Sequence, residues 1–383
     1  MASIRTLPIR VPPRPGEALD SWLEAIADRT HTAWIDLLAA VGLPTAGTTH
    51  AYEWMLRLAP EQTRSIGYAT GVDESIIGAM TLTHFADATL DTSIGTGWRT
   101  VPWGRVGGSR FCPQCLGESG GRWELRWWWG WSFACSRHHC LLADRCPACG
   151  KRQRSRVFPG QMIPQPGFCM SPAPDSRGRA ATRCGHDLST TFVVGFPADH
   201  PVLDAQQLLD DLSTIDRAGF GIYGRNPQPA VAALADIRAI AGRALSYASF
   251  DELSRILPTD LMDAYRGGLK VQPGPQLRHT QRGSARGSAV ATAAGVTVAF
   301  GVLTAPMSLM PVTHCAGLSP QHGSRDERSP PRTSDGAVTS PACSPLCNCR
   351  RWTRCSPPAT NFATGPPPTP RAGPPPNPRA TNA

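Results

Sequence analysis

Eight cysteines lie within one 73-residue stretch of the chain, and their spacing is that of metal ligands. The eight are Cys112, Cys115, Cys135, Cys140, Cys146, Cys149, Cys169 and Cys184. Two Cys-x-x-Cys pairs, Cys112/Cys115 and Cys146/Cys149, flank a Cys-x-x-His pair formed by Cys135 and His138. Each pair offers two ligands across a tight turn, which is the spacing of tetrahedral zinc sites.

Structural zinc takes four nitrogen or sulfur ligands, so the sequence predicts two structural Zn²⁺ sites. The first set is Cys112, Cys115, Cys135 and His138, and the second is Cys146, Cys149, Cys169 and Cys184. The second set is less completely specified, because Cys169 and Cys184 form no local pair and His186 is an alternative to Cys184. In the first set His139 and Cys140 could substitute for a ligand, but only His138 has the x-x spacing. Cys140 is therefore expected to be a spare thiol.

Catalytic roles for these cysteines fit the sequence less well. Redox catalysis by Cys-x-x-Cys needs a thioredoxin-like strand and helix around the motif, which is not apparent. Catalytic zinc needs an open position and a general base. The nearby acids Glu118, Glu124 and Asp144 fall in no recognised motif. We therefore expect a protein that is not an enzyme.

Basic charge concentrates on the cysteine segment. Residues 1–98 carry 6 basic and 11 acidic side chains, whereas residues 99–156 carry 11 and 3. This balance makes the segment a candidate for phosphate contact, although it is also compatible with the solubility of an arginine-rich protein. The candidate nucleic-acid contacts are Arg122, Arg126, Arg137, Lys151, Arg152 and Arg154. The tryptophan-rich run 123–133 is expected to pack over the zinc modules, with base stacking as the alternative.

The elements that must position these residues are mainly helical. In residues 1–98, apolar residues at helical spacing predict helices, and 61–69 and 73–83 have helix-turn-helix spacing around Ala69 and Gly71. The second of these helices carries Asp73 and Glu74 and no Lys or Arg. A helix that reads DNA normally brings cations to phosphates, so protein contact is favoured over DNA binding here.

Helical patterns return in 197–268, whereas the last part of the chain is low in complexity. The uncharged stretch Ala289–Leu309 fits a buried Ala-rich helix better than a membrane span, because it has few large aliphatic residues. Beyond about residue 310 the chain is rich in Pro, Arg, Ser and Cys, which predicts disorder and is what a shifted reading frame of GC-rich DNA would encode. The predicted domains are 1–98 (helical, helix-turn-helix-like), 99–190 (double zinc finger), 191–310 (helical) and 311–383 (disordered tail). The fold class is mainly α with small zinc-knuckle or zinc-ribbon modules.

Together these motifs resemble the TniQ family. The resemblance rests on the opening Leu7–Pro15, on Glu17–Leu23, on Phe111–Leu116 with Arg122 and Trp123, on Cys135–His138, on Cys146–Cys149, and on Cys184–Leu188. It covers residues 5–190, and more loosely extends to about 265. It implies a helical N-terminal domain followed by zinc modules, with the eight ligands above carried over. It also implies an accessory role in Tn7-like and mercury-resistance-type transposition.

The expected function is therefore a non-enzymatic zinc-binding adaptor in DNA transposition. The resemblance implies an AAA+ ATPase and a transposase as partners, together with a target-recognition protein or RNA-guided complex. DNA contact and a homodimer are possible, and no membrane partner is expected. Because residues 1–15 lack the apolar core of a signal peptide, a cytoplasmic location is expected. The alternative function is a transcription regulator that binds DNA through its helix-turn-helix and zinc fingers.

Overall fold

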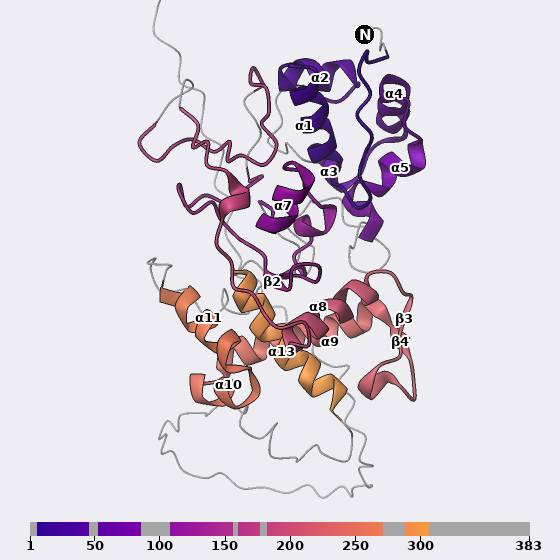
Figure 1. Cartoon of the computed structure of the whole chain (residues 1–383). Helices are drawn as coiled ribbons and strands as arrows, with labels where there is room; N and C mark the ends of the chain where they lie inside the picture. Colours follow the sequence, from indigo (N-terminus) through magenta and orange to yellow (C-terminus); the bar gives the residue numbers. More distant parts are fainter. Residues whose placement is uncertain are drawn as a thin grey trace, which may run out of the picture. The chain divides into compact units, whose positions relative to one another are not determined.

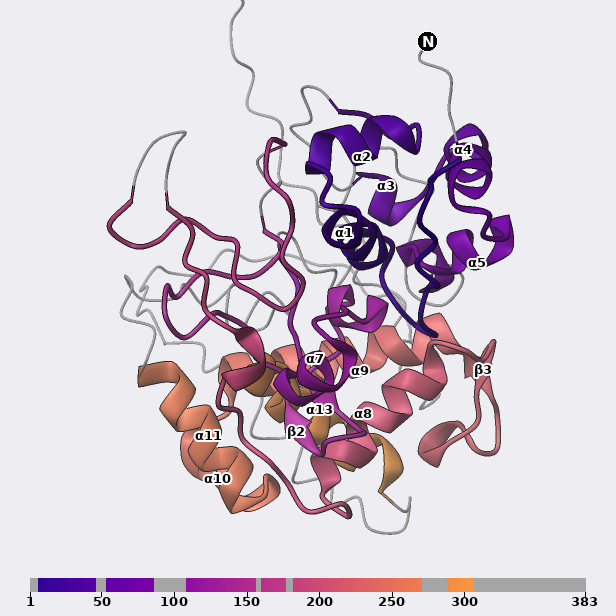
Figure 2. The same ribbon diagram turned by 45° about the horizontal axis from the view of Figure 1, so that its top comes forward.

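The computed structural model describes residues 6–45, 53–85, 108–155, 160–176, 182–270 and 288–305. The chain divides into two units, Met1–Pro320 and Gln321–Ala383, and all described residues belong to the first. Figures 1 and 2 show that helices dominate this unit, and short strands occur only as two-stranded pairs in the part described. The mainly helical fold class is confirmed. The predicted tail 311–383 lies outside the described residues.

The N-terminal region begins with α1 (Leu19–Arg29), α2 (Trp34–Ala40) and α3 (Glu53–Leu56). Asp20 lies in the first turn of α1 and Arg29 in its last, both favourable to the helix dipole. Every side chain from residue 19 to residue 27 is buried, including those of Asp20, Ser21 and Glu24. The predicted helix is confirmed, but it is buried on all sides and not only on its apolar face.

The predicted hairpin is formed by α4 (Pro60–Thr70) and α5 (Glu74–Ala79). Pro60 begins α4, where a missing N–H costs nothing, and Gly71 ends it in the left-handed conformation with φ 73°. Asp73 then caps α5 by accepting a hydrogen bond from the Ser75 backbone N–H at 2.8 Å. The helix ends at Ala79, earlier than predicted, and a 3-10 helix follows at Leu82–Phe85.

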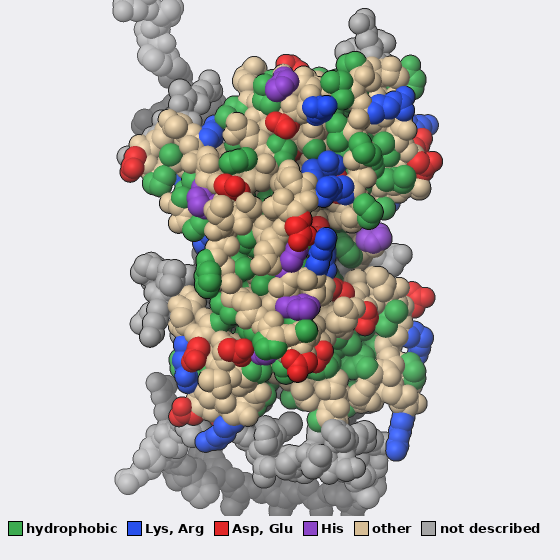
Figure 3. Space-filling view, in the orientation of Figure 1, with side chains coloured by type: hydrophobic (Ala, Val, Ile, Leu, Met, Phe, Trp, Pro, Cys, Tyr) green, Lys and Arg blue, Asp and Glu red, His purple; other side chains and the backbone are tan. Residues whose placement is uncertain are grey.

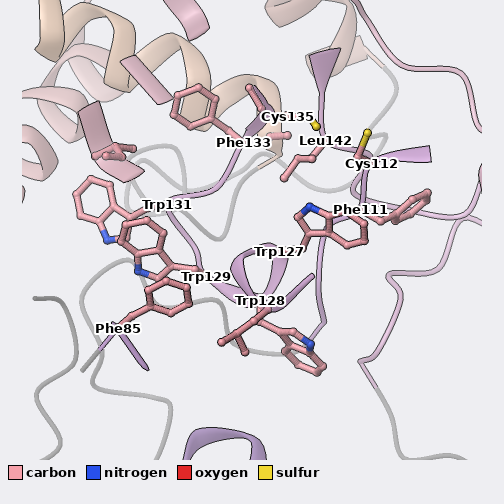
Figure 4. Packing of buried hydrophobic residues seen from close by; sticks show 14 of the residues in the cluster. Phe85, Phe111, Cys112, Trp127, Trp128, Trp129, Trp131, Phe133, Cys135 and Leu142 are labelled. Carbon is pink, nitrogen blue, oxygen red and sulfur yellow. The ribbon is translucent and has the colours of Figure 1, made fainter. Parts of the chain in front are cut away.

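The cysteine segment contains α7 (Pro113–Ser119) and an antiparallel pair of strands, β1 (Ala134–Cys135) and β2 (Cys140–Leu141). The five tryptophans that the structure describes in this segment, between residues 123 and 131, are all buried at no more than 4% exposure. Trp129 stacks on Phe85 at 5.3 Å between ring centroids and lies 6.4 Å from Trp131 (Figure 4). The packing prediction is confirmed, and the base-stacking alternative is wrong for these rings because none is exposed.

The C-terminal elements are α8 (Pro201–Leu212), α9 (Ala230–Tyr247), α10 (Phe250–Ile256), α11 (Thr259–Lys270) and α13 (Ala289–Thr304), with the strands β3 (Arg217–Ala218) and β4 (Gln228–Pro229). The uncharged helix α13 is buried against α8, α9 and α11 (Figures 1 and 2). The buried Ala-rich helix is therefore confirmed, and it ends at Thr304. No helix within the described ranges is long and apolar enough to cross a membrane.

Buried residues from all of these elements form one hydrophobic cluster. It runs from the N-terminal helices through the tryptophans to α13. The fully buried Arg110 contributes to this continuity, because it donates hydrogen bonds to the Gly130 carbonyl at 3.2 Å and the Thr292 hydroxyl at 2.9 Å. The domain boundaries predicted at residues 98, 190 and 310 stay predictions.

Candidate metal centres

The first predicted ligand set comes together around the start of α7 and the β1–β2 turn. Cys112 and Cys115 flank the first turn of α7, Cys135 ends β1, and His138 follows in the turn. The sulfurs of Cys115 and Cys135 are 3.7 Å apart. Nδ1 of His138 lies 3.4, 3.2 and 3.6 Å from the sulfurs of Cys112, Cys115 and Cys135.

These distances fit a tetrahedral zinc ion. With Zn–S bonds of about 2.3 Å and Zn–N bonds of about 2.0–2.1 Å, a tetrahedron has S···S edges of about 3.8 Å and S···N edges of about 3.6 Å. All four ligand atoms lie within 4.8 Å of one another. Three thiols and an imidazole are also a common donor set of structural zinc sites. The residues therefore fit a metal ion.

A carboxylate orients the histidine of the first cluster. Nε2 of His138 lies 2.9 Å from Oε1 of Glu118, which follows Cys115 by one helical turn on α7. The hydrogen bond to His138 and the nearby Arg137 lower the pKa of the Glu118 carboxyl. This arrangement leaves Nδ1 facing the three thiols and is typical of metal-ligating histidines.

Cys140 lies beside the first cluster and outside its four ligands. It pairs with Cys135 across β1 and β2, and its sulfur is 3.9 Å from that of Cys112. The neighbouring Cys112 thiolate and burial raise the pKa of the Cys140 thiol far above its usual range. Cys140 is not one of the four residues whose ligand atoms all lie within 4.8 Å of one another, which agrees with its expected role as a spare thiol.

The second predicted ligand set also comes together. The sulfur of Cys146 lies 3.8 Å from that of Cys184, and the sulfur of Cys149 lies 3.6 Å from that of Cys169. All four sulfurs are within 4.8 Å of one another, so the same tetrahedral argument applies. His186 is not in this set, so the structure places Cys184 and not His186 with the other three thiols.

Long-range backbone pairing creates the half-site that the sequence did not reveal. The Cys184 N–H donates to the Ser171 carbonyl, and the Gly185 N–H donates to the Cys169 carbonyl, both at 2.9 Å. This pairing brings Cys169 and Cys184 together although 14 residues separate them. Gln153 supports the site because its amide Nε2 donates to the Cys169 sulfur at 3.4 Å.

The two clusters differ in exposure. All three cysteines of the first cluster are buried, whereas Cys149 and Cys184 of the second are half-buried. A chelator in solution can therefore approach the second cluster more easily than the first.

Four of the six predicted phosphate contacts form ion pairs within the chain, and three of these four are at least partly buried. Arg122 pairs with Glu17, with Nη2 2.6 Å from Oε2, and Arg126 pairs with Glu124 at 2.6 Å. Arg154 binds both Asp20 and Glu24, with Nη2 2.5 Å from Oε2 of Glu24.

The other three candidates differ in their exposure. Arg137 pairs with Glu118 at 2.9 Å but remains 67% exposed, and Lys151 and Arg152 are half-buried. On the face shown in Figure 3, basic side chains are interspersed with acidic ones. Nucleic-acid contact by these six residues stays a prediction.

A buried charge cluster joins α1 to the cysteine segment, and the sequence reading missed it. Glu17 pairs with Arg122, and Asp20 and Glu24 both pair with Arg154. Burial raises the pKa of Glu24 to about 7, although Arg154 opposes the rise, and it also raises the pKa of Asp20. The signal for this cluster was the recurrence of acids at positions 17, 20 and 24, on one face of a helix.

Comparison with known proteins identifies the N-terminal part of the chain. The TniQ family model matches residues 8–142, which span the N-terminal helices, the hairpin and the whole first cluster but end before Cys146. A search of curated proteins found no match to the chain. The match over residues 8–142 supports a TniQ assignment for this part of the chain.

Proposed function

We propose that this protein is a non-enzymatic zinc-binding adaptor of DNA transposition that links target recognition to an AAA+ ATPase and a transposase. The observation that carries the proposal is the TniQ match over residues 8–142, because this family is one of non-catalytic transposition accessory proteins. The adaptor would act in the cytoplasm, where reduced thiols remain available to metal.

The chemistry of the two clusters supports a structural role for zinc. Each cluster supplies four protein ligands, so a bound ion would have no open position for water or substrate. The carboxylate nearest to the first cluster, Glu118, is engaged by His138 and Arg137. Zinc would therefore hold the modules together and would not activate a nucleophile.

The surface of the hairpin supports protein contact. On α4 and α5, Tyr68 is 63% exposed and Ile76 is 47% exposed, and the acidic residues Asp73 and Glu74 are exposed beside Ile76. Exposed aromatic and aliphatic residues favour protein interfaces, and carboxylates repel phosphate. We assign the hairpin to a protein partner, such as the target-recognition protein or the RNA-guided complex. Arg137, Lys151 and Arg152 of the basic segment would face DNA or the ATPase.

A reconstituted transposition assay tests this function. The full chain is combined with an AAA+ ATPase and a transposase of a transposon of this type, and target-directed insertions are counted with and without the chain. We expect insertion to require the chain, and Tyr68→Ala with Ile76→Asp to reduce it about tenfold or more. Arg64→Gln, an exposed change on α4, should leave insertion unchanged. Undiminished insertion without the chain would contradict the proposal. A mobility shift showing sequence-specific DNA binding by the chain alone would favour the transcription regulator.

A further inference from the structure

The segment between the two half-sites of the second cluster reaches back to the N-terminal helices. This segment follows Cys149 and precedes Cys169, and Arg154 is part of it. Arg154 has the unusual φ of 53° and holds its guanidinium 4.5 Å from the ring centroid of Trp123. From there it donates to Oε1 and Oε2 of Glu24 at 3.0 and 2.5 Å. A buried bidentate pair of this kind fixes the position of the middle of α1.

The same segment caps the N-terminus of α2. The Trp34 N–H donates to the Met162 carbonyl at 2.9 Å, and the Ile35 N–H donates to the Gly160 carbonyl at 2.8 Å. The first N–H groups of a helix have no partner within the helix, so these two carbonyls satisfy donors that α2 cannot satisfy itself. The approach is close, because a Cβ on Gly160 would lie 3.0 Å from Cβ of Ile35.

A metal ion bound by the second cluster would join the two ends of this segment. Its ends are tied by the four thiols of the second cluster, and the four cysteines are free, with no disulfide between them. Without an ion, the Cys146/Cys149 turn and the Cys169/Cys184 pair are joined by weak contacts, which are the thiol pairs and the hydrogen bond from Gln153 to the Cys169 sulfur. The chain between them would then gain conformational entropy and lose its fixed position.

The start of α1 is anchored independently of the second cluster. The Ala18 N–H donates to the Trp123 carbonyl at 2.9 Å, and the Leu125 N–H donates to the Gly16 carbonyl at 2.8 Å. Trp123 and Leu125 belong to the stretch between Cys115 and Cys135 of the first cluster. The start of α1 would therefore stay attached when the second cluster opens.

The first cluster also holds the C-terminal helices. The backbone N–H groups of Phe133 and Ala134 donate to Oε1 of Gln206 on α8 at 2.8 and 3.1 Å. The Phe196 N–H donates to the His139 carbonyl at 2.7 Å. These contacts do not involve the segment between Cys149 and Cys169.

We propose that metal at Cys146, Cys149, Cys169 and Cys184 is a latch on the N-terminal helices. Bound metal holds Arg154 on Glu24 and the Gly160 and Met162 carbonyls on α2. Loss of that one ion releases α2 and the middle of α1, while the first cluster and α8 stay folded. The half-buried Cys149 and Cys184 make this ion the first that a chelator removes. The inference rests on the second cluster binding metal and is independent of the role in transposition.

Hydrogen-deuterium exchange on the full chain, combined with metal counting, tests the latch. Cys149→Ser should leave one zinc per chain and speed exchange in α2 about tenfold or more, with exchange in α8 nearly unchanged. Limited chelation of the wild-type chain to one zinc should give the same pattern. Arg154→Gln should keep both ions and speed exchange in the middle of α1, whereas the exposed Arg64→Gln should change neither the ion count nor the exchange.

Three results would overturn the latch. The first is unchanged exchange in α2 after one ion is lost, which would show that this ion does not hold the helix. The second is equal loosening of α2 and α8, which would make the second site a determinant of the whole fold. The third is two retained ions in Arg154→Gln with unchanged exchange in the middle of α1, which would show that Arg154 does not hold this helix. A failed transposition assay would leave all three readouts intact, so the two proposals fail separately.

Discussion

Glu24 lies in a buried cluster of three carboxylates and two guanidinium groups. Its pKa of about 7, raised by burial from the ordinary 4.5, means that the folded protein holds a proton that the unfolded chain releases. The stabilising contribution is therefore complete below about pH 4.5 and is lost as the pH rises through about 7. Glu24→Gln mimics the protonated form and keeps an oxygen for Arg154.

We expect Glu24→Gln to be more stable than the wild type at pH 8, by no more than about 3 kcal/mol. The gain should shrink toward pH 6, where wild-type Glu24 is mostly protonated. Urea unfolding of zinc-saturated protein at pH 6, 7 and 8 measures this difference. A variant that is less stable at pH 8 would instead show that the ionised pair with Arg154 stabilises the fold.

Glu118 tests the chemistry of the first cluster without removing a ligand. Glu118→Gln replaces the carboxylate that accepts from Nε2 of His138 at 2.9 Å. Partners of this kind raise the basicity of the ligating nitrogen, so zinc affinity at the first site should fall about 10–100-fold. Competition with a chromogenic chelator measures the affinity. Glu61→Gln, an exposed acid on α4, is the control, and equal affinities in the two variants would exclude a role for Glu118.

At the scale of elements, the sequence predicted those features that depend on residues close together in the chain. Gly71 and Asp73 locate the α4–α5 hairpin because a left-handed residue and a helix cap are local requirements. The pairing of Cys169 with Cys184 was not predictable as a half-site, because backbone hydrogen bonds between distant segments create it. The burial of residues 19–27 of α1 on every side was missed for the same reason, since Arg154 arrives from 130 residues along the chain.

Helix α13 offers a matched pair of glycines. A Cβ on Gly295 would lie 2.8 Å from Cδ1 of Leu245 and 3.1 Å from Cβ of Ala241, whereas a Cβ on Gly301 would meet nothing within 4 Å. Gly301→Ala should stabilise the protein by about 0.5–1 kcal/mol through helix propensity. Gly295→Ala should lose that gain, and about 1 kcal/mol more, to overpacking against α9. Thermal unfolding compares the two, and equal stabilisation would show that α13 does not pack closely on α9.

At the scale of the whole molecule, the two clusters differ in what they connect. The family match contains the first cluster and stops before the second, yet buried contacts continue to α13. Asp144, between the clusters, pairs with Arg110 and accepts a hydrogen bond from the Ala289 N–H at 2.6 Å. This acid stabilises the N-terminus of α13, where the helix dipole favours negative charge. The first cluster therefore lies among contacts to both ends of the described fold.

This asymmetry predicts unequal effects of losing each ion. The purified full chain should contain two zinc ions, each contributing on the order of 10 kcal/mol of apparent folding free energy. Cys112→Ser removes a fully buried ligand of the first cluster, whose neighbours hold both α1 and α8. It should speed hydrogen exchange in both helices, because the contacts that hold α1 and the contacts that hold α8 would both be lost. Iron instead of zinc, or a Cys112→Ser variant whose exchange matches the wild type, would contradict a structural role for the first site.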